Sequence, residues 1–243
     1  MLGKEYVQKV LRLVEQATDS QYEQVQEAAG FIFESLKTGG LLHLFGCGHS
    51  NIPVEECFYR AGGLVPVNPI FESSLMLHEG AVKSSQLERL SGYAPLILDR
   101  HATKKGEAII IFSNSGINSL PIEMAMAAKE KGLHVIALTS MSYAKEKSRH
   151  ADGKKLYQVA DIVIDTGIPH GDALVELESS KVCAVPGSTV VGTTLINMII
   201  AEILALYDKE ELQPSVFISG NVEGGFEKNS AYITEYSKVV KCL

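Results

Sequence analysis

Apolar and polar residues follow a helical period at the start of the chain. Apolar residues recur every three or four positions over residues 6–17 and again over residues 25–36, which predicts two amphipathic helices. Asp19 or Ser20 is expected to cap the second helix, and the glycine pair at 39–40 is expected to end it. The apolar faces of both helices need a partner, and the pattern leaves open whether that partner is a sheet of the same chain or a second subunit.

Beyond residue 40 the pattern changes to short apolar runs that alternate with helical segments. The expected strands are residues 41–45, 64–67, 107–112, 133–138 and 161–164, with residues 216–218 as a further candidate. The expected helices are residues 53–61, 120–131 and 190–207, a charged surface helix at 143–153, helices and loops over 81–105, and a last helix from 231 to about 240. This alternation predicts an α/β fold with three layers, αβα, around a doubly wound, mostly parallel five-stranded sheet.

The length of 243 residues suits one large α/β domain or two small ones, and we expect one. Residues 1–40 form the helical pair, which belongs to this domain and is expected to contact a second subunit. Residues 41–210 form the main body, and residues 211–243 form a C-terminal loop and helix.

Composition excludes several classes of partner. With 46% hydrophobic residues, 21% charged residues and a net charge of -7, the chain has no basic footprint for nucleic acid. Cys47, Cys57, Cys183 and Cys242 show neither a C-x-x-C pair nor zinc-ligand spacing, which favours reduced thiols in a cytoplasmic protein. The N-terminus lacks the apolar core of a signal peptide, and the polar residues within 190–207 favour a buried helix over a membrane span.

The first strand ends in a turn that is suited to binding an anion. Gly46 and Gly48 interrupt the apolar run, and His49, Ser50 and Asn51 follow before a helical segment begins. Such a turn directs backbone N–H groups and the positive end of a helix toward a ligand such as phosphate. An ordinary strand-to-helix turn, with glycine for its backbone freedom, explains this stretch alone equally well. A dinucleotide fingerprint is disfavoured because Asn51 stands where its third glycine is needed, and no Walker motif follows the glycines.

Two further turns carry hydroxyl groups. The segment SNSGIN at 113–118 follows the most clearly buried strand, and the segment GST at 187–189 precedes the long apolar helix. Because the carboxyl ends of parallel strands meet at one edge of a sheet, we expect the three turns to converge there. Hydroxyls and backbone N–H groups at a helix N-terminus can hold a dianion without an arginine, although a serine at such a place also commonly caps a helix. The candidate binding residues of the three turns are Gly46, Gly48, His49, Ser50, Asn51, Ser113, Asn114, Ser115, Asn118, Ser188 and Thr189.

The three turns together resemble the sugar isomerase (SIS) domain family of phosphosugar isomerases and phosphosugar-binding proteins, over residues from about 41 to 207. The helical pair before them suits the branch that contains phosphoheptose isomerase and N-acetylmuramic acid 6-phosphate etherase. The resemblance implies a flavodoxin-like sheet, a phosphorylated sugar as ligand, and phosphate binding by Ser113 and Ser115 with help from Ser50 and Ser188. It also implies a homodimer or homotetramer, in which the glycine-rich loop 221–229 would complete a neighbour's site.

Isomerisation of an aldose to a ketose needs a carboxylate as general base and a second acid or base to open the ring. Glu72 follows the second expected strand and resembles the catalytic glutamate in the sugar isomerase domain of glucosamine-6-phosphate synthase. Glu79 resembles the glutamate of the VEGAE segment in the etherase, and His78 lies beside it. Glu72, Glu79 and His78 are therefore the candidate catalytic residues of an isomerase or a related lyase.

Two departures from the phosphoheptose isomerases motivate a second hypothesis, a phosphosugar sensor without catalysis. Six and ten residues beyond the first-turn serine those enzymes carry a histidine and a glutamate, where this chain has Glu56 and Arg60. On their late helix they carry a glutamine and a histidine, where this chain offers Asn197 and Ala205. We therefore predict no metal site and no cofactor.

Overall fold

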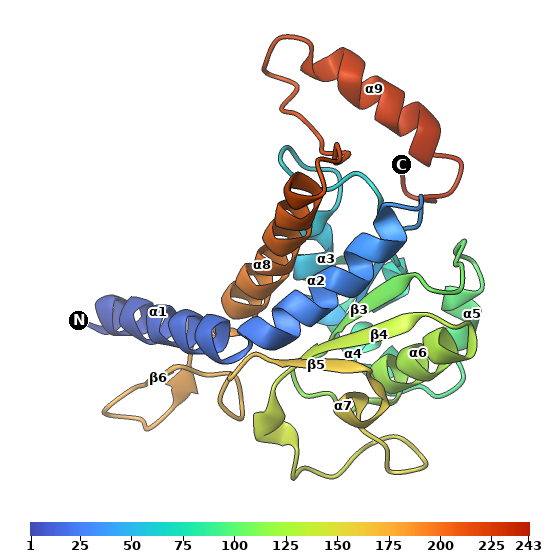
Figure 1. Ribbon diagram of the computed structural model, residues 1–243. Helices are drawn as coiled ribbons and strands as arrows, with labels where there is room; N and C mark the ends of the chain where they lie inside the picture. Colours follow the sequence, from blue (N-terminus) through green and yellow to red (C-terminus); the bar gives the residue numbers. More distant parts are fainter.

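Five short parallel strands form the centre of the protein (Figure 1). In the computed structural model, which describes residues 1–243, their order is β2-β1-β3-β4-β5, and Leu42 of β1 lies opposite Val67 of β2 and Ala108 of β3. Every residue of the first three strands is buried, as expected for a parallel sheet covered on both faces. The strands are β1 (Leu42–Gly46), β2 (Val67–Pro69), β3 (Ala108–Phe112), β4 (His134–Thr139) and β5 (Ile162–Asp165). The α/β class and the doubly wound sheet are thereby confirmed.

Helices cover both faces of this sheet. One face packs against α2, α3 and α8, and the other face packs against α5, α6 and α7. The helices are α1 (Leu2–Ser20), α2 (Tyr22–Leu36), α3 (Ile52–Cys57), α4 (Ala81–Leu87), α5 (Ala94–Leu98), α6 (Ser119–Glu130), α7 (Leu156–Val159), α8 (Ser188–Lys209) and α9 (Gly225–Tyr236). Shorter elements are the 3-10 helices η1 (Gly48–Asn51), η2 (Ser73–Leu75), η3 (Leu77–Glu79) and η4 (Met141–Tyr143), and the antiparallel pair β6 (Val175–Glu176) and β7 (Cys183–Ala184).

The helix α8 is the apolar core helix of its layer. It is long and apolar enough to cross a membrane by length and composition alone. In the fold, however, Ile196, Ile199 and Ile203 are fully buried in the cluster that α8 shares with α2 and the sheet. The expectation of a buried helix at this place agrees with the structure.

The two N-terminal helices differ in how much of their apolar face is covered. In α2 the apolar residues from Val25 to Leu36 other than Phe31 are buried in the core, so the partner of this face of α2 lies within the chain. In α1 only Val10 and Ala17 are buried, while Val7 and Leu11 are 52% and 55% exposed. Figure 1 shows α1 extending beyond the edge of the sheet.

Several expected elements differ from the structure. The second strand is residues 67–69, not 64–67, because β1 pairs with Val67–Pro69, and Pro69 is tolerated on this edge strand, where only one side of the backbone is paired. Leu64 and Val216 form an isolated antiparallel bridge, so residues 216–218 add no strand to the sheet.

Other boundaries shift for local reasons. The charged segment 143–153 is not a helix: after η4 it continues in turns, and the hydroxyl of Ser148 bonds to the backbone of His150 and Lys154. The last helix starts earlier than expected, at Gly225, directly after Gly224 in a left-handed conformation with φ 74°. Gln21 occupies the N-cap position of α2, where Asp19 or Ser20 was expected, and Gly187 occupies the N-cap position of α8. The helix α3 ends at Cys57 rather than continuing to residue 61.

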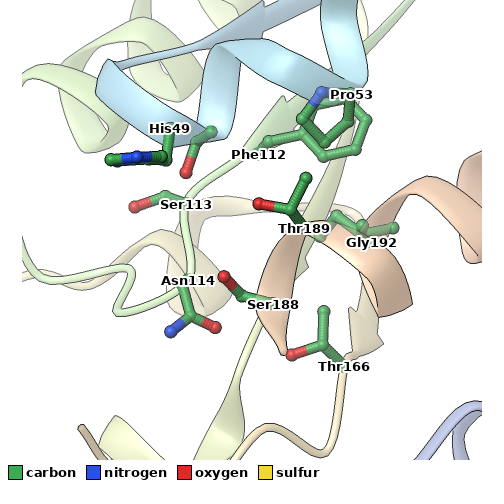
Figure 2. Close-up of a pocket in the computed structure, with 11 residues that line it drawn as sticks. His49, Pro53, Phe112, Ser113, Asn114, Thr166, Ser188, Thr189 and Gly192 are labelled. Carbon is green, nitrogen blue, oxygen red and sulfur yellow. The ribbon is translucent and has the colours of Figure 1, made fainter. Parts of the chain in front are cut away.

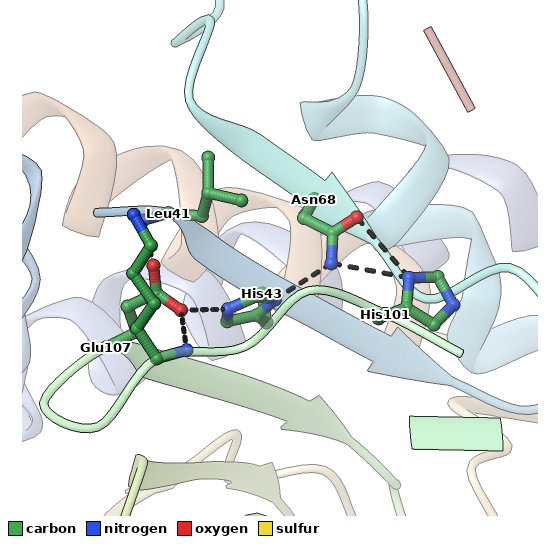
Figure 3. A network of polar contacts seen from close by, with 6 residues as sticks. Leu41, His43, Asn68, His101 and Glu107 are labelled. Carbon is green, nitrogen blue, oxygen red and sulfur yellow. Dashed lines mark hydrogen bonds and ion pairs between the residues drawn. The ribbon is translucent and has the colours of Figure 1, made fainter. Parts of the chain in front are cut away.

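A chain of buried polar side chains links three strands near their amino ends (Figure 3). His43 has no exposed surface, its Nε2 donates to Glu107 Oε2 at 2.8 Å, and its Nδ1 accepts from Asn68 Nδ2 at 2.8 Å. Glu107 also accepts the backbone N–H groups of Leu41 and Lys104 at 3.0 and 2.6 Å. Burial raises the pKa of Glu107, but the hydrogen bonds from His43 and the two backbone groups outweigh it and leave the pKa below its usual value. The network thus holds a charged carboxylate inside the sheet.

His101 ends the network on the side of β2. Its Nδ1 lies 3.4 Å from the side-chain amide of Asn68, and burial is the main cause that lowers its pKa to about 4. At neutral pH His101 is therefore an uncharged partner, and Glu107 is the charge on which the network depends.

We predict that Glu107→Ala lowers the free energy of unfolding by about 3–5 kcal/mol, because it leaves the partners of a buried charge unpaired. Since the folded-state pKa of Glu107 is depressed, its contribution is complete above the unfolded pKa of about 4.3 and is lost as the pH falls through the folded value. Urea unfolding at pH 7 and at pH 4 should show a difference from the wild type that shrinks at the lower pH. The control Glu130→Ala, on the exposed end of α6, should change stability by less than about 0.5 kcal/mol. An equally small effect of Glu107→Ala would contradict the role of the network.

Candidate functional site

The carboxyl ends of the strands surround a small cavity, which we call the three-turn hollow (Figure 2). Its walls include residues that follow β1 and β3, the two strands between which the strand order reverses, which is where ligands bind in doubly wound sheets. Its cavity volume is about 30 Å³, well below the range of about 300–1,000 Å³ for small-molecule sites, so the hollow itself admits only a small group of a ligand. It is lined by His49, Ser50, Pro53, Phe112, Ser113, Asn114, Leu138, Thr166, Ser188, Thr189 and Gly192.

The first turn depends on two glycines. A Cβ at Gly46 would overlap the backbone carbonyl of Ser50, so only glycine allows the chain to fold back so closely after β1. Gly48 has a φ of 55°, and the N–H of Ser50 donates to Cys47 O at 3.0 Å. This closed turn places the side chains of His49 and Ser50 on the wall of the hollow.

The second turn is fixed by the end of β4. Asn114 O accepts from the N–H of Ser140 at 2.9 Å, and Gly116 has a φ of 61° and so little room that a Cβ would lie 2.8 Å from Thr139 Oγ1. The side chain of Ser113 is buried, and its Oγ accepts from the N–H of Gly116 at 3.3 Å. The turn leads directly into the N-terminus of α6.

The third turn is held by the carboxylate of Asp172. Asp172 Oδ1 accepts the N–H groups of Gly187 and Ser188 at 3.0 and 2.9 Å, and its Oδ2 accepts the hydroxyl of Ser188 at 2.5 Å. Asp172 itself has a left-handed backbone with φ 51°, which aspartate tolerates better than most residues. An internal negative charge thus occupies the positive end of the helix α8.

The wall of the hollow is polar but almost uncharged. It contains no lysine, arginine, aspartate or glutamate, and His49 is its one titratable side chain. Hydroxyl groups come from Ser50, Ser113, Ser188, Thr189 and Thr166. Such a wall can donate hydrogen bonds to an oxygen-rich ligand.

Cys47 lies in the first turn but offers no nucleophile. Its side chain is 5% exposed, and burial raises the pKa of the thiol well above its usual value, with a smaller contribution from Glu88. A thiol kept protonated in this way is unreactive. No three His, Cys, Asp or Glu side chains are grouped as they would be around a metal ion.

The structure brings six of the eleven candidate binding residues to the hollow. These are His49, Ser50, Ser113, Asn114, Ser188 and Thr189. Gly46 and Gly48 shape the first turn instead, and the buried Asn51 donates to Glu55 Oε1 at 2.7 Å. Ser115 does not line the hollow, and Asn118 Oδ1 accepts from Arg149 at 2.5 Å.

The candidate catalytic residues lie outside the hollow of this chain. Glu72 accepts from the hydroxyl of Ser74 at 2.9 Å and lies 3.8 Å from Arg100. Glu79 forms an exposed ion pair with Lys83 at 2.8 Å, and this hydrogen bond is the main cause that lowers the pKa of Glu79. His78 is exposed beside it.

The segment that carries Glu79 and His78 nevertheless packs against the first turn. A Cβ at Gly48 would lie 3.8 Å from Leu77 of η3 and 3.8 Å from Ser84 of α4. Glu79 and His78 therefore belong to a segment that lies close to the first turn, but they do not line the cavity.

The sequence prediction missed five lining residues: Pro53, Phe112, Leu138, Thr166 and Gly192. Thr166 is the most polar of them and directly follows β5. Thr166 could have been predicted from the sequence, because it is a hydroxyl residue at the carboxyl end of an expected strand. Ser113 was chosen as a candidate for the same reason. Gly192 lies one helical turn after Ser188 on α8 and could be found by that spacing.

Comparison with known proteins identifies related chains. A family profile described as SIS domain matches residues 5–140, so the third turn lies beyond the matched part. A UPF0309 protein of Geobacillus thermodenitrificans is 44% identical over 240 residues, covering 98% of this chain and 96% of its own. A UPF0309 protein of Caldanaerobacter subterraneus is 48% identical over 242 residues, covering 98% of both chains.

Two solved structures share the fold at low sequence identity. A phosphoheptose isomerase from Neisseria gonorrhoeae has a TM-score of 0.54 and 18% identity, with coverage of 84% of this chain and 95% of that one. A phosphoheptose isomerase from Francisella tularensis has a TM-score of 0.52 and 13% identity, with coverage of 84% and 98%. At these identities the likeness concerns the fold alone.

We predict that Asp172→Asn lowers the free energy of unfolding by about 1 kcal/mol, because a neutral amide replaces a charge at the N-terminus of α8 and keeps fewer of its hydrogen bonds. Asparagine is chosen because it also tolerates the left-handed backbone at this position. Glu178→Gln, an exposed change on the same β6–β7 segment, is the matched control and should have almost no effect on urea unfolding. Equal stability of Asp172→Asn and the wild type would show that the carboxylate does not hold the third turn.

Proposed function

The chain belongs to the SIS-domain family and to the UPF0309 proteins, and we propose that it binds a phosphorylated sugar in the three-turn hollow and acts on it as an aldose–ketose isomerase or a related lyase. The observation that carries this proposal is the convergence of Ser50, Ser113, Ser188 and Thr189 on one cavity. Hydroxyl groups from separate turns, with no charged side chain among them, suit an oxygen-rich ligand whose negative charge is balanced by backbone N–H groups.

The phosphate group would bind between the first and second turns. Ser50 and Ser113 supply hydroxyls there, and the 12-residue helix α6 directs its N-terminus toward the end of the second turn. The third turn is less suitable for a dianion, because Asp172 already occupies the backbone N–H groups of Gly187 and Ser188. The phosphosugar isomerases of similar fold support the ligand class, and the family resemblance supports the serine positions.

The isomerase step needs a base next to the sugar carbonyl. A carboxylate removes a proton from the hydroxyl-bearing carbon beside the carbonyl, and the carbonyl oxygen takes up a proton from an acid as the electron pair moves onto it, which gives an enediol. The former carbonyl carbon then takes the proton back from the carboxyl group, while the other hydroxyl loses its proton and becomes the new carbonyl. Glu72 and Glu79 are the proposed bases. Since neither lines the hollow of its own chain, this proposal requires that a second copy, in a homodimer or homotetramer, or a movement of η2 and η3, brings one of them to the ligand.

A phosphosugar sensor without catalysis is the second candidate function. It is favoured by the absence of any carboxylate from the wall of the hollow. It is also favoured by Glu56 and Arg60, which form an ion pair with each other at the positions where phosphoheptose isomerases carry a histidine and a glutamate.

We predict that Ser50→Ala and Ser113→Ala each weaken the binding of sugar phosphates by about 10- to 100-fold, the effect of removing one hydrogen bond to a charged group. Isothermal titration with a panel of aldose and ketose phosphates and with inorganic phosphate measures this. Ser91→Ala, at an exposed position that does not line the hollow, is the control and should bind as the wild type does. Wild-type affinity in both hollow variants would contradict phosphate binding at this place.

For catalysis, we predict that the wild type exchanges a carbon-bound proton of a bound sugar phosphate with deuterated water. Glu72→Gln or Glu79→Gln should slow this exchange at least 100-fold without weakening binding, because the amide cannot accept the proton. Glu130→Gln on α6 serves as the control. Binding without exchange in the wild type would support the sensor, and unchanged exchange in both variants would remove these glutamates as bases.

A further inference from the structure

Two buried polar atoms in the three-turn hollow have no hydrogen-bond partner. Among the buried side-chain nitrogen and oxygen atoms of the protein, only Gln24 Oε1, Asn114 Oδ1 and Thr166 Oγ1 are unpaired. Two of these three belong to residues that line the hollow (Figure 2). An unpaired buried polar group costs about 1–3 kcal/mol, so native proteins keep few of them. Their concentration in one cavity points to a ligand group that pairs with them.

The position of Thr166 is set by the fold and not by its hydroxyl. The residue is 4% exposed, and its backbone N–H donates to Thr139 O at 2.9 Å in continuation of the β4–β5 pairing. The next residue is held as well, since the N–H of Gly167 donates to Asp165 Oδ1 at 2.9 Å. A valine would fill about the same volume without leaving a polar group unpaired. The packing of the folded chain therefore does not require the hydroxyl group of Thr166.

Asn114 is fixed through its backbone in the same way. Its carbonyl accepts from the N–H of Ser140 at 2.9 Å and from Thr139 Oγ1 at 3.4 Å, which leaves the side chain free of any role in holding the turn. Its amide oxygen is an acceptor without a donor.

The side of the hollow near Thr166 presents acceptors. Ser188 donates its only hydroxyl proton to Asp172, so toward the cavity its Oγ can only accept. Asn114 Oδ1 is an acceptor, and Thr166 Oγ1 can both donate and accept. A phosphate dianion carries acceptors alone and would meet the charge of Asp172 here, whereas a ligand hydroxyl can donate to Asn114 or Ser188 and accept from Thr166.

We propose that Thr166, Asn114 and Ser188 form a subsite for a free hydroxyl group of the ligand, next to the phosphate that Ser50 and Ser113 hold. The inference rests on the proposed phosphosugar binding and adds to it that the protein distinguishes polyhydroxylated sugar phosphates from simple phosphate esters. Thr166 is the specificity residue of this subsite.

The experiment compares three ligands on three proteins by isothermal titration. The ligands are inorganic phosphate, ethyl phosphate, which has no free hydroxyl beyond the phosphate, and the sugar phosphate that binds most tightly in the panel above. The proteins are the wild type, Thr166→Val, which keeps the shape and removes the hydroxyl, and Thr166→Ser, which keeps the hydroxyl. Thr166→Ala makes the same deletion with less crowding and replaces valine if that variant does not fold.

The expected result separates the three ligands. The wild type binds the sugar phosphate more tightly than ethyl phosphate, and Thr166→Val loses about five- to tenfold in affinity for the sugar phosphate alone, the effect of one neutral hydrogen bond. Thr166→Ser keeps wild-type affinity. The melting temperature of ligand-free Thr166→Val is equal to or above that of the wild type, because an unpaired buried hydroxyl has been removed, whereas a purely structural hydroxyl would lower it.

Two results would overturn the subsite while leaving phosphosugar binding intact. One is unchanged affinity of Thr166→Val for the sugar phosphate, and the other is an equal loss for all three ligands, which would place Thr166 in the phosphate grip. If the wild type binds neither phosphate nor any sugar phosphate, the proposed function itself fails, and the subsite fails with it.

Discussion

The close return of the chain after β1 is the constraint on which the site depends. Any side chain at Gly46 would overlap the carbonyl of Ser50, so the turn can only close because glycine ends the strand. A second close approach, of Gly116 to Thr139, fixes the turn after β3. Because β1 and β3 are neighbours at the point where the strand order reverses, the turns after these two strands lie on opposite sides of one cavity. Neither glycine places a side chain in this cavity.

The polar groups around this cavity are divided between donors and acceptors. On one side the hydroxyls of Ser50 and Ser113 stand near the start of α6 and can donate to an anion. On the other side Asp172 accepts the backbone N–H groups of Gly187 and Ser188 and the hydroxyl of Ser188, so that the Ser188 oxygen can only accept a further hydrogen bond. One carboxylate, which does not line the cavity itself, therefore leaves the third turn poor in free donors, which agrees with the proposed position of the phosphate at the first two turns.

Much of the fold follows from local sequence pattern. Strands β3 and β4 are continuous apolar runs, and α8 combines length with apolar character, so their identity could be predicted to within one or two residues. The edge strand β2 was misplaced because its residues Asn68 and Pro69 are poor strand formers, and they pair there only because His43 and Leu44 of β1 lie opposite. The position of β2 is therefore set by its pairing with β1 and not by the strand propensity of its own residues.

The residues of the site likewise fall into those that could be predicted from the sequence and those that could not. Turns that contain glycine and serine can be recognised in the sequence, so six of the candidate binding residues do line the hollow. The contact of Asp172 with Ser188 could not be predicted, because it bridges 16 residues of irregular chain that no periodic pattern describes. Thr166 was missed although it follows an expected strand, since a single hydroxyl without neighbouring glycines does not resemble a binding turn. The candidates Glu72 and Glu79 rested on family resemblance, which gives position along the chain but not orientation.

We propose that the first two turns bind a phosphate group and that the third turn binds a hydroxyl group. A crystal structure of the protein with a bound sugar phosphate tests both points at once. We expect the phosphorus atom between Ser50 and Ser113 and a sugar hydroxyl within hydrogen-bond distance of Thr166 Oγ1. A phosphate bound elsewhere, for instance in the separate cavity lined by Tyr59, Arg60 and Phe226, would contradict it.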